Sequence, residues 1–303
     1  MPASAYFRGK FVPLSEANMG VMTNSFHYGT GAFEGIRGNW NSEHEQLYLF
    51  RIKEHYQRMY KSCKVLKIDL PYSVDELCRI TVELAQRCEF HEDIYIRPVA
   101  YKSSEALGVR LHDLDSDFMV FAFPWGHYLD VEKAKCGISS WRRPKEVPQA
   151  KLTGLYLNSA LAKTEAIDNG FDEAIMLTSE GYVSEGSGEN IFLVIDGKLV
   201  TPAVYNNILM GITRNTIIQL AENELGIETI ERSIERCELY NVEECFFTGT
   251  AAHLIPIGEI NHRSIGNGDS GEITKKLQRL YFDVILGKNP KYMDWCTPVY
   301  KKA

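Results

Sequence analysis

Apolar residues in the first half of the chain recur at the spacing of amphipathic helices. One stripe repeats every three or four residues and consists of Ile52, Tyr56, Met59, Cys63 and Leu66. Arg58 lies off this stripe. A second helix is predicted from Ser73, whose hydroxyl can cap it while the Glu76 side chain reaches back. Short strands are predicted before these helices at 7–12 and 47–50, and after them at 93–101 and 117–123.

The second half shows the same alternation with clearer turn signals. The predicted elements are a strand at 136–142, a helix from 156 to 170, a hairpin over 174–183, a turn at 196–197, a helix from 211 to 226, a buried strand at 246–250 and a helix over 273–284. The tail beyond Gly287 is expected to add nothing to the core.

The segment 124–135 breaks this pattern, because it holds aromatic and charged residues with no clear period. We therefore predict a small N-terminal α/β domain at 1–124, an interdomain loop at 125–135 and a larger C-terminal domain at 136–303. The elements together predict a two-domain fold of the α+β or α/β class.

Charge, apolar run length and cysteine spacing argue against several kinds of partner. The 303 residues carry 33 basic and 40 acidic side chains, a net charge of -7, with no dense cluster of Lys and Arg, which argues against a nucleic-acid partner. No apolar run is long enough to span a bilayer and the start does not resemble a signal peptide, so we expect a cytoplasmic protein with no membrane partner. Seven cysteines without a Cys-x-x-Cys pair predict reduced core residues and no metal site.

Candidate chemistry centres on Lys151, which sits among small and apolar residues with Tyr156 five positions later. Burial disfavours an ammonium, so a buried lysine loses its proton more easily and can form a Schiff base with an aldehyde. The alternative is an ordinary surface lysine on a loop.

A second candidate is the acidic turn after Tyr182-Val183. Glu185 and Glu189 flank a Gly-Ser-Gly turn beside the apolar run 191–195, which is predicted to be a buried strand. A carboxylate next to a buried strand needs a partner, and the protonated nitrogen of a pyridine ring is one possibility. A solvated turn is the alternative.

Two Gly-Thr segments could hold an anion. The helix that opens at Gly211-Ile212-Thr213 has backbone N–H groups and the positive end of its dipole at its start, and Gly249-Thr250 forms a second turn of this kind. On these turns alone the chain could equally be a non-catalytic phosphate- or nucleotide-binding protein. However, it lacks the Gly-x-x-x-x-Gly-Lys-Ser/Thr and Gly-x-Gly-x-x-Gly patterns.

Several sequence blocks, in one order, resemble those of a known family. They are His27-Tyr28-Gly29-Thr30-Gly31-Ala32-Phe33-Glu34-Gly35-Ile36-Arg37, Tyr95-Ile96-Arg97-Pro98, Phe123-Pro124-Trp125-Gly126, Lys151 to Asn190, Gly211-Ile212-Thr213-Arg214 and Thr248-Gly249-Thr250-Ala251-Ala252. The chain resembles the fold-type IV pyridoxal phosphate enzymes of the D-amino-acid aminotransferase-like fold, and most closely the branched-chain amino-acid aminotransferases.

The resemblance implies pyridoxal 5′-phosphate (PLP) as the cofactor. By likeness, Lys151 binds the cofactor aldehyde and then moves a proton between the substrate's alpha carbon and the cofactor. Glu185 corresponds to the carboxylate at the ring nitrogen, and Tyr156 to the tyrosine near the phenolic oxygen. The residues that match the phosphate site are Arg58, Ile212, Thr213 and Thr250.

The resemblance also implies the substrates: leucine, isoleucine or valine exchanges its amino group with 2-oxoglutarate, reversibly. Tyr95, with the amides of Thr250 and Ala251, is expected to take the amino acid's carboxylate. The expected pocket walls are Tyr28, Phe33, Val109, Trp125 and Tyr128. For Phe33 and Val109, plain core packing is an equal alternative.

Arg97, with Tyr28 nearby, is expected to bind the distal carboxylate of glutamate or 2-oxoglutarate. Arg97 and Arg37 could equally form structural ion pairs. Tyr28 and Val109 are expected to reach the site of a neighbouring subunit, which implies a homodimer or a larger homo-oligomer.

Two departures from the family pattern affect the expected substrate range more than the reaction. The segment 152–155 replaces small residues and an asparagine, and His253 stands where a glutamate is usual. The rival functions within the same fold are a D-amino-acid or (R)-amine transaminase and aminodeoxychorismate lyase.

Overall fold

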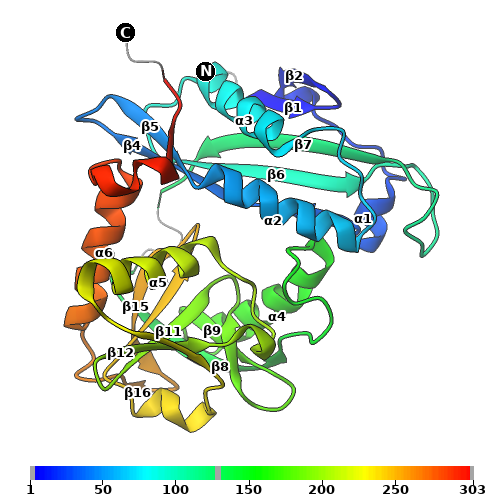
Figure 1. Ribbon diagram of the computed structural model, residues 1–303. Helices are drawn as coiled ribbons and strands as arrows, with labels where there is room; N and C mark the ends of the chain where they lie inside the picture. Colours follow the sequence, from blue (N-terminus) through cyan, green and yellow to red (C-terminus); the bar gives the residue numbers. More distant parts are fainter. Residues whose placement is uncertain (1–3, 127–130, 301–303) are drawn as a thin grey trace. The chain divides into compact units, whose positions relative to one another are not determined.

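The computed structural model describes residues 4–126 and 131–300 (Figure 1). They divide into two compact units, one made of 4–126, 150–155 and 283–300, the other of 131–149 and 156–282. These units differ from the predicted domains because 150–155 and 283–300 group with the first unit. The predicted boundaries stay a proposal, and residues 127–130 of the predicted interdomain loop lie outside the described residues.

The first unit is built on an antiparallel sheet with the strand order β17-β5-β4-β6-β7-β1-β2, and β3 also pairs with β6. Its strands are β1 (Ser4–Phe7), β2 (Lys10–Pro13), β3 (Gly31–Phe33), β4 (Ile36–Asn41), β5 (Gln46–Phe50), β6 (Ile94–Lys102), β7 (Ser116–Pro124) and β17 (Cys296–Pro298). The predicted strands at 47–50, 93–101 and 117–123 are therefore present.

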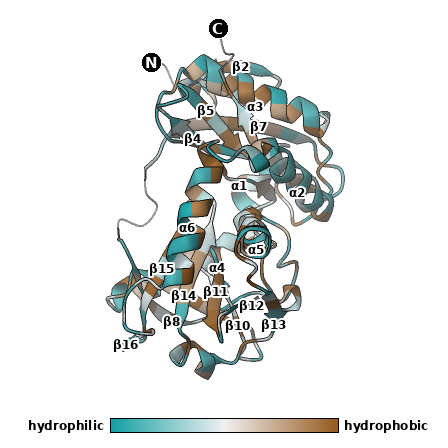
Figure 2. Cartoon of the chain, turned by 60° about the vertical axis from the view of Figure 1, so that its left-hand side comes forward, coloured by the Kyte–Doolittle hydropathy of each residue, from teal (hydrophilic) through white to brown (hydrophobic). Residues whose placement is uncertain are grey.

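Helices α2 (Ile52–Val65) and α3 (Val74–Cys88) bury their apolar stripes in the core of the first unit, while α1 (Asn24–Tyr28) is short. The predicted stripe from Ile52 to Cys63 is buried, and Leu66 follows at the helix end. Ser73 and Glu76 form the predicted reciprocal cap of α3. Figure 2 shows both polar and apolar segments along α3, as expected of a helix with one face against a core.

The predicted single strand at 7–12 is wrong, because the chain reverses within it. β1 pairs with β2 as a hairpin whose two turn residues, Arg8 and Gly9, have φ values of 49° and 80°. Two consecutive positive φ values are typical of the tight turn whose twist matches paired strands. The break in apolar residues at Arg8-Gly9-Lys10, with a glycine at its centre, was a readable turn signal that the prediction overlooked.

The expectation for the C-terminal tail is also wrong. After the 3-10 helix at Pro290–Trp295, β17 adds to the edge of the first sheet beside β5, and Val299 is buried. Gln46 donates to the carbonyl of Tyr300, and Gln86 to that of Val299, at 2.7 and 2.6 Å. The tail is part of the core of the first unit.

The second unit is built on a mixed sheet with the strand order β10-β9-β8-β15-β14-β11-β12-β13, and β16 pairs with β15. Its strands are β8 (Ala134–Arg142), β9 (Glu173–Leu177), β10 (Val183–Gly186), β11 (Asn190–Ile195), β12 (Lys198–Pro202), β13 (Thr229–Arg232), β14 (Glu244–Gly249), β15 (His253–Ile260) and β16 (Arg263–Ser264). The pairs β8–β9, β8–β15 and β12–β13 are parallel and the others antiparallel.

Three longer helices accompany this sheet: α4 (Tyr156–Asp168), α5 (Ile212–Leu225) and α6 (Glu272–Ile285), with α6 ending in the first unit. Helix α5 begins after Gly211 and ends at Gly226, whose φ of 64° suits glycine. Helix α4 turns small residues inward, Ser159, Ala162 and Ala166, and its larger Ile167 is exposed.

Candidate active site

Lys151 is fixed through its backbone in the first unit. Its carbonyl accepts a hydrogen bond from the N–H of Phe33 on β3, and its own N–H donates to the hydroxyl of Ser62 on α2, both at 3.0 Å. The next residue, Leu152, bridges to Ala32 and is buried. The lysine Nζ lies 5.0 Å from the centre of the Phe33 ring. Lys151 belongs to no helix or strand and is half-buried, so it lies on a loop that is tied to β3 and α2.

An arginine surrounded by aromatic rings lies on the same side of the first sheet as Phe33. Arg97 and Tyr95 are two residues apart on β6 and so share one face. The guanidinium carbon of Arg97 lies 4.8 Å from the Phe33 ring centre and 5.2 Å from that of Tyr95, and Nη2 donates to the Tyr95 hydroxyl at 3.2 Å. The Trp125 ring is 4.6 Å from that of Tyr95. The structure thus brings together four of the predicted substrate residues.

The close approach of Tyr95 requires a glycine at position 35. A Cβ atom on Gly35 would lie 2.0 Å from the Tyr95 hydroxyl oxygen, a distance that no packed structure allows. Gly35 therefore sets the position of Tyr95. Arg37, two residues later on β4, donates to the carbonyl of Gly126 at 2.6 Å and lies 4.0 Å from the Asp93 carboxylate. These contacts agree with the alternative that Arg37 forms a structural ion pair.

The unusual segment after Lys151 has a structural explanation. The Thr153 hydroxyl bonds to the carbonyl of Gly29 at 2.9 Å and accepts from the N–H of Gly31 at 3.2 Å. Gly154 packs directly on Gly29, where a Cβ would lie 2.7 Å from the Gly154 Cα. The departures at 153 and 154 thus attach the lysine segment to the chain before β3.

Arg58 is held by a buried carboxylate. On α2, its Nε and Nη2 atoms donate to the two oxygens of Glu34 at 2.8 and 2.7 Å, and the Nδ1 atom of His55 lies 2.7 Å from the same carboxylate. Burial alone would raise the pKa of Glu34, but the Arg58 charge and the hydrogen bonds from Arg58 and His55 lower it to about 2. Arg58, the predicted phosphate ligand, is therefore paired with a fully ionised partner.

Glu185, in the second unit, is held by three donors. Its Oε1 atom accepts from Arg143 at 2.7 Å, and its Oε2 atom accepts from the Asn190 amide at 2.9 Å and the N–H of Leu209 at 3.0 Å. The side chains of Glu185 and Arg143 are both less than a tenth exposed. A buried carboxylate beside a guanidinium is stabilised as the anion, which is the form that a protonated ring nitrogen requires.

Asn190 brings the other predicted groups of the second unit to one end of its sheet. Asn190 pairs with Thr248 across β11 and β14, so the turn at Thr250 and Ala251 lies at the same end of the sheet as the turn after Glu185. A Cβ on Gly211 would lie 2.0 Å from the Asn190 side-chain oxygen, so the start of α5 is also packed here. The N-cap residue of that helix is Gly211, which has no side chain to cap it, and Ile212 and Thr213 begin the first turn. A helix start beside a Thr turn suits a phosphate group.

Four predicted residues lie apart from the contacts described above or cannot be placed. The Tyr28 hydroxyl accepts from the N–H of Gly108 at 3.0 Å, and Val109 is 91% exposed, so both belong to the surface of this chain. Tyr128 lies outside the described residues. Tyr156 begins α4 in the second unit and is half-buried.

Sequence reasoning missed the residues that hold the candidate ones. On α2, His55 lies three residues before the predicted Arg58 and Ser62 four residues after it, and this polar stripe beside the apolar one was a readable signal. Arg143 and Glu34 gave no such signal, because a buried ion pair depends on contacts between distant parts of the chain.

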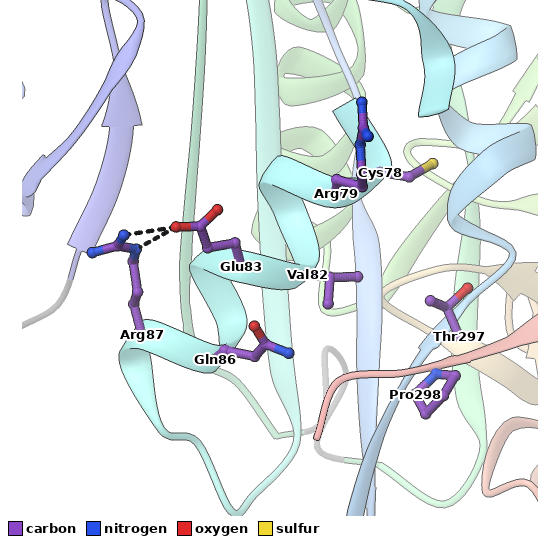
Figure 3. A pocket seen from close by; sticks show the side chains of 8 residues that line it. All are labelled: Cys78, Arg79, Val82, Glu83, Gln86, Arg87, Thr297 and Pro298. Carbon is purple, nitrogen blue, oxygen red and sulfur yellow. Dashed lines mark hydrogen bonds and ion pairs between the residues drawn. The ribbon is translucent and has the colours of Figure 1, made fainter. Parts of the chain in front are cut away.

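A separate hollow of about 700 Å³ lies between α3 and the C-terminal strand of the first unit (Figure 3). Its lining includes Cys78, the Glu83–Arg87 ion pair and Pro298, and none of the predicted site residues. Among residues 4–126 and 131–300, no group of His, Cys, Asp or Glu could hold a metal ion. Within the same residues, no helix is long and apolar enough to cross a membrane.

Comparisons with known proteins agree with this geometry. The family model described as amino-transferase class IV matches residues 31–260. A probable branched-chain-amino-acid aminotransferase from Aquifex aeolicus is 50% identical over 98% of this chain and 97% of its own length. The crystal structure of a branched-chain aminotransferase from Thermoproteus uzoniensis with norvaline is 44% identical with a TM-score of 0.95, covering 99% and 100% of the two chains.

A further crystal structure shows a related enzyme with a cofactor adduct. This T.th. branched-chain amino acid aminotransferase, complexed with N-(5′-phosphopyridoxyl)-L-glutamate, is 40% identical with a TM-score of 0.93, covering 99% of each chain. These findings confirm the predicted family and fold class. This chain belongs to the branched-chain-amino-acid aminotransferases of the class IV amino-transferase family.

Proposed function

We propose that this chain transfers the amino group between L-leucine, L-isoleucine or L-valine and 2-oxoglutarate, with PLP as its cofactor. The observation that carries the proposal is the position of Lys151. Its backbone is bonded to β3 and α2, and its amine lies over Phe33, beside the cluster of Arg97, Tyr95 and Trp125.

Each unit, taken by itself, holds residues that suit one of the charges of PLP. When bound, PLP supplies an aldehyde that takes up the amino group and a ring that accepts electrons. Glu185, kept anionic by Arg143, is placed to hold a protonated ring nitrogen. In the second unit, the start of α5 at Ile212 and Thr213 and the Thr250 turn offer donors that suit a phosphate. In the first unit, Arg58 offers positive charge that suits the same group.

Lys151 carries out the proton transfer in this proposal. Its free amine would accept a proton from the alpha carbon of the amino acid and donate it to the cofactor carbon that carries the amino group. Tyr156, five residues later, would tune the phenolic oxygen of the cofactor through its hydroxyl.

The arginine cluster of the first unit suits both substrates. Phe33 and Trp125 offer apolar walls for a branched side chain, while the Arg97 guanidinium, already oriented by Tyr95, can engage the distal carboxylate of glutamate. The T.th. relative was crystallised with a glutamate adduct of the cofactor, which supports a dicarboxylate substrate here.

A second copy of the chain completes the proposal. Around α1 and the loop at 107–109, apolar side chains are unusually exposed: Val21 79%, Phe26 72%, Leu107 56% and Val109 91%. Apolar surface of this kind marks an interaction site in a soluble protein. We infer a cytoplasmic homodimer, or a larger assembly of dimers, in which this surface is covered by the partner.

The experiment that tests the function is a panel of amino donors with 2-oxoglutarate as acceptor. We expect glutamate formation with L-leucine, L-isoleucine and L-valine. Faster turnover of D-alanine or an (R)-amine would reassign the chain to the D-amino-acid or amine transaminases, and pyruvate release from aminodeoxychorismate would identify the lyase.

A chemical label tests the position of the lysine. Borohydride reduction of the loaded protein should attach the cofactor to the peptide that contains Lys151, and Lys151→Ala should abolish the label and lower turnover by about 1000-fold or more. Lys145→Ala, which removes an exposed lysine six residues earlier, is the matched control. A label on another peptide would contradict the proposal.

A further inference from the structure

One face of α2 contacts both the lysine segment and Arg58. His55, Arg58 and Ser62 lie at spacings of three and four residues, so their side chains project from the same side of the helix. Ser62 accepts the N–H of Lys151, while His55 and Arg58 both bond to Glu34. A single helical face therefore holds two groups of the proposed cofactor site.

Glu34 is the fully buried centre of this arrangement. It lies between β3 and β4, its N–H donates to the carbonyl of Pro98 at 3.0 Å, and its side chain has no exposed surface. Both carboxylate oxygens bond to Arg58 in the parallel, bidentate geometry that fixes the plane of a guanidinium.

His55 fixes the other side of the carboxylate. Burial lowers the pKa of His55 despite the neighbouring Glu34, so the ring is neutral at pH 7. An ionised carboxylate can only accept, and the Nδ1 atom, 2.7 Å away, must therefore carry the ring proton and donate it to Glu34. Glu34 is thus held from two directions and cannot follow Arg58 if the arginine moves.

We propose that Glu34 and His55 are positioning residues for the cofactor phosphate: they hold the guanidinium of Arg58 in the one orientation that engages it. This inference rests on the proposed function, in which Arg58 binds phosphate. The Nε–Nη2 edge of Arg58 is committed to Glu34, so the orientation of the whole planar group follows from the carboxylate.

Positioning and charge predict opposite effects at Glu34. A carboxylate next to Arg58 offsets its positive charge, so by Coulomb attraction alone Glu34→Gln would strengthen phosphate binding. If Glu34 acts by orienting Arg58, then Glu34→Gln weakens phosphate binding, and Glu34→Asp does too, although it keeps the charge. The shorter aspartate cannot span the same bidentate geometry.

The test compares two ligands that differ only in the phosphate. The full-length protein is stripped of cofactor and titrated with PLP and with pyridoxal, and the ratio of the two dissociation constants is measured for each variant. We expect Glu34→Asp, Glu34→Gln and His55→Gln each to weaken PLP binding by about 10-fold, a typical size for coupled neighbours in one hydrogen-bond network, with pyridoxal binding unchanged.

The matched control is Glu54→Gln, which breaks the Arg51–Glu54 ion pair on the same helix, 2.8 Å between Nε and Oε1. It should leave both affinities unchanged. In an Arg58→Gln background, Glu34→Asp should have no further effect on the PLP-to-pyridoxal ratio, because the group that it orients is gone. The His55 variant, whose change is smallest, carries the test if a Glu34 variant does not fold.

The other possible results would contradict either the positioning role of Glu34 and His55 or the phosphate-binding role of Arg58. If Arg58→Gln lowers the phosphate-dependent ratio but the Glu34 and His55 variants do not, the positioning role is wrong and the phosphate site stands. Equal losses for PLP and pyridoxal would mean a structural role only. If Arg58→Gln itself leaves the ratio unchanged, the proposed phosphate ligand and the inference both fail.

Discussion

Two buried glutamates, one in each unit, have the same burial and opposite charge behaviour. Glu34 in the first unit has its pKa lowered to about 2, whereas Glu189 in the second unit has its pKa raised to about 8. Burial raises both. At Glu34 the charge and hydrogen bonds of Arg58 and His55 outweigh it, while at Glu189 the carboxylates of Glu173 and Glu185 add to it.

The difference lies in which residue receives the cation. In the second unit, Lys163 pairs with Glu173 at 2.7 Å and Arg143 with Glu185 at 2.7 Å, so Glu189 is left with the N–H of Gly188 as its close donor among the bonds described. Its neutral form at pH 7 avoids a third buried negative charge. Partners, and not depth, decide whether a buried acid is charged.

The contrast between a charged Glu34 and a neutral Glu189 is tested most strongly by removing the Arg58 cation, which should cause the largest loss of stability. Among the contacts of the described residues, Arg58→Met leaves the buried carboxylate of Glu34 with His55 as its side-chain partner. Removing one member of such a pair typically lowers the free energy of unfolding by about 3 to 5 kcal/mol. Urea denaturation of the cofactor-free protein measures the change.

A double variant shows whether the lost stability comes from leaving the Glu34 charge without Arg58. Arg58→Met with Glu34→Gln removes both charges and should recover much of the lost free energy of unfolding. A single Arg58→Met variant as stable as the unaltered protein would mean that Glu34 is neutral in the folded state.

The pH dependence of stability should show Glu34 next. Its folded pKa, about 2, lies below the ordinary value of 4.5, so its contribution is fully present above pH 4.5 and is lost as the pH falls towards 2. The difference corresponds to about 3 kcal/mol. Denaturation curves between pH 6 and 2.5 should fall less steeply for Glu34→Gln than for the unaltered chain. Parallel curves would contradict the ionised state of Glu34.

Glu189 should show the opposite sign in a different pH window. Its folded pKa, about 8, is above the ordinary value of 4.5, so the folded state keeps a proton that the unfolded state releases, and stability falls as the pH rises from about 4.5 to 8. Glu189→Gln imitates the protonated form. The variant should match the unaltered protein at pH 5 and exceed its free energy of unfolding at pH 8. Equal stability of the two proteins at both pH values would show that Glu189 is ionised.

The sequence predicted the local features well. The apolar stripe of α2, the reciprocal cap at Ser73 and the turn at Asp196-Gly197 depend on neighbouring residues, and the structure contains all three. The hairpin at Arg8-Gly9 was missed although its glycine and the break in apolar residues were readable. The strand β17 was missed because it pairs with β5, which is 246 residues earlier at the register pair Cys296 and Phe50.

The residues of the candidate site also fall into those that the sequence could predict and those that it could not. Lys151 and Glu185 could be identified because motif residues are contiguous in the chain, and their chemical types suggest their roles. The residues that hold Arg58 and Glu185 could not. Glu34 and Arg58 are 24 residues apart, and Arg143 and Glu185 are 42 apart, so their pairing depends on the fold. The opposite charge states of Glu34 and Glu189 are likewise unreadable from two glutamates in Gly-rich segments.

The smallest expected effect tests whether uncharged contacts matter less than the charged pair in the same unit. The Thr153 hydroxyl bonds to Gly29 and Gly31, yet it carries no charge, and a typical hydrogen bond of this kind contributes about 1 kcal/mol. Thr153→Val should lower the free energy of unfolding by that amount, while Thr153→Ser, which keeps the hydroxyl, should change it less. Because the bonds attach the lysine segment to the chain before β3, turnover should fall with Thr153→Val but remain with Thr153→Ser. A Thr153→Val loss as large as that of Arg58→Met would mean that the contrast between charged and neutral contacts is wrong for this unit.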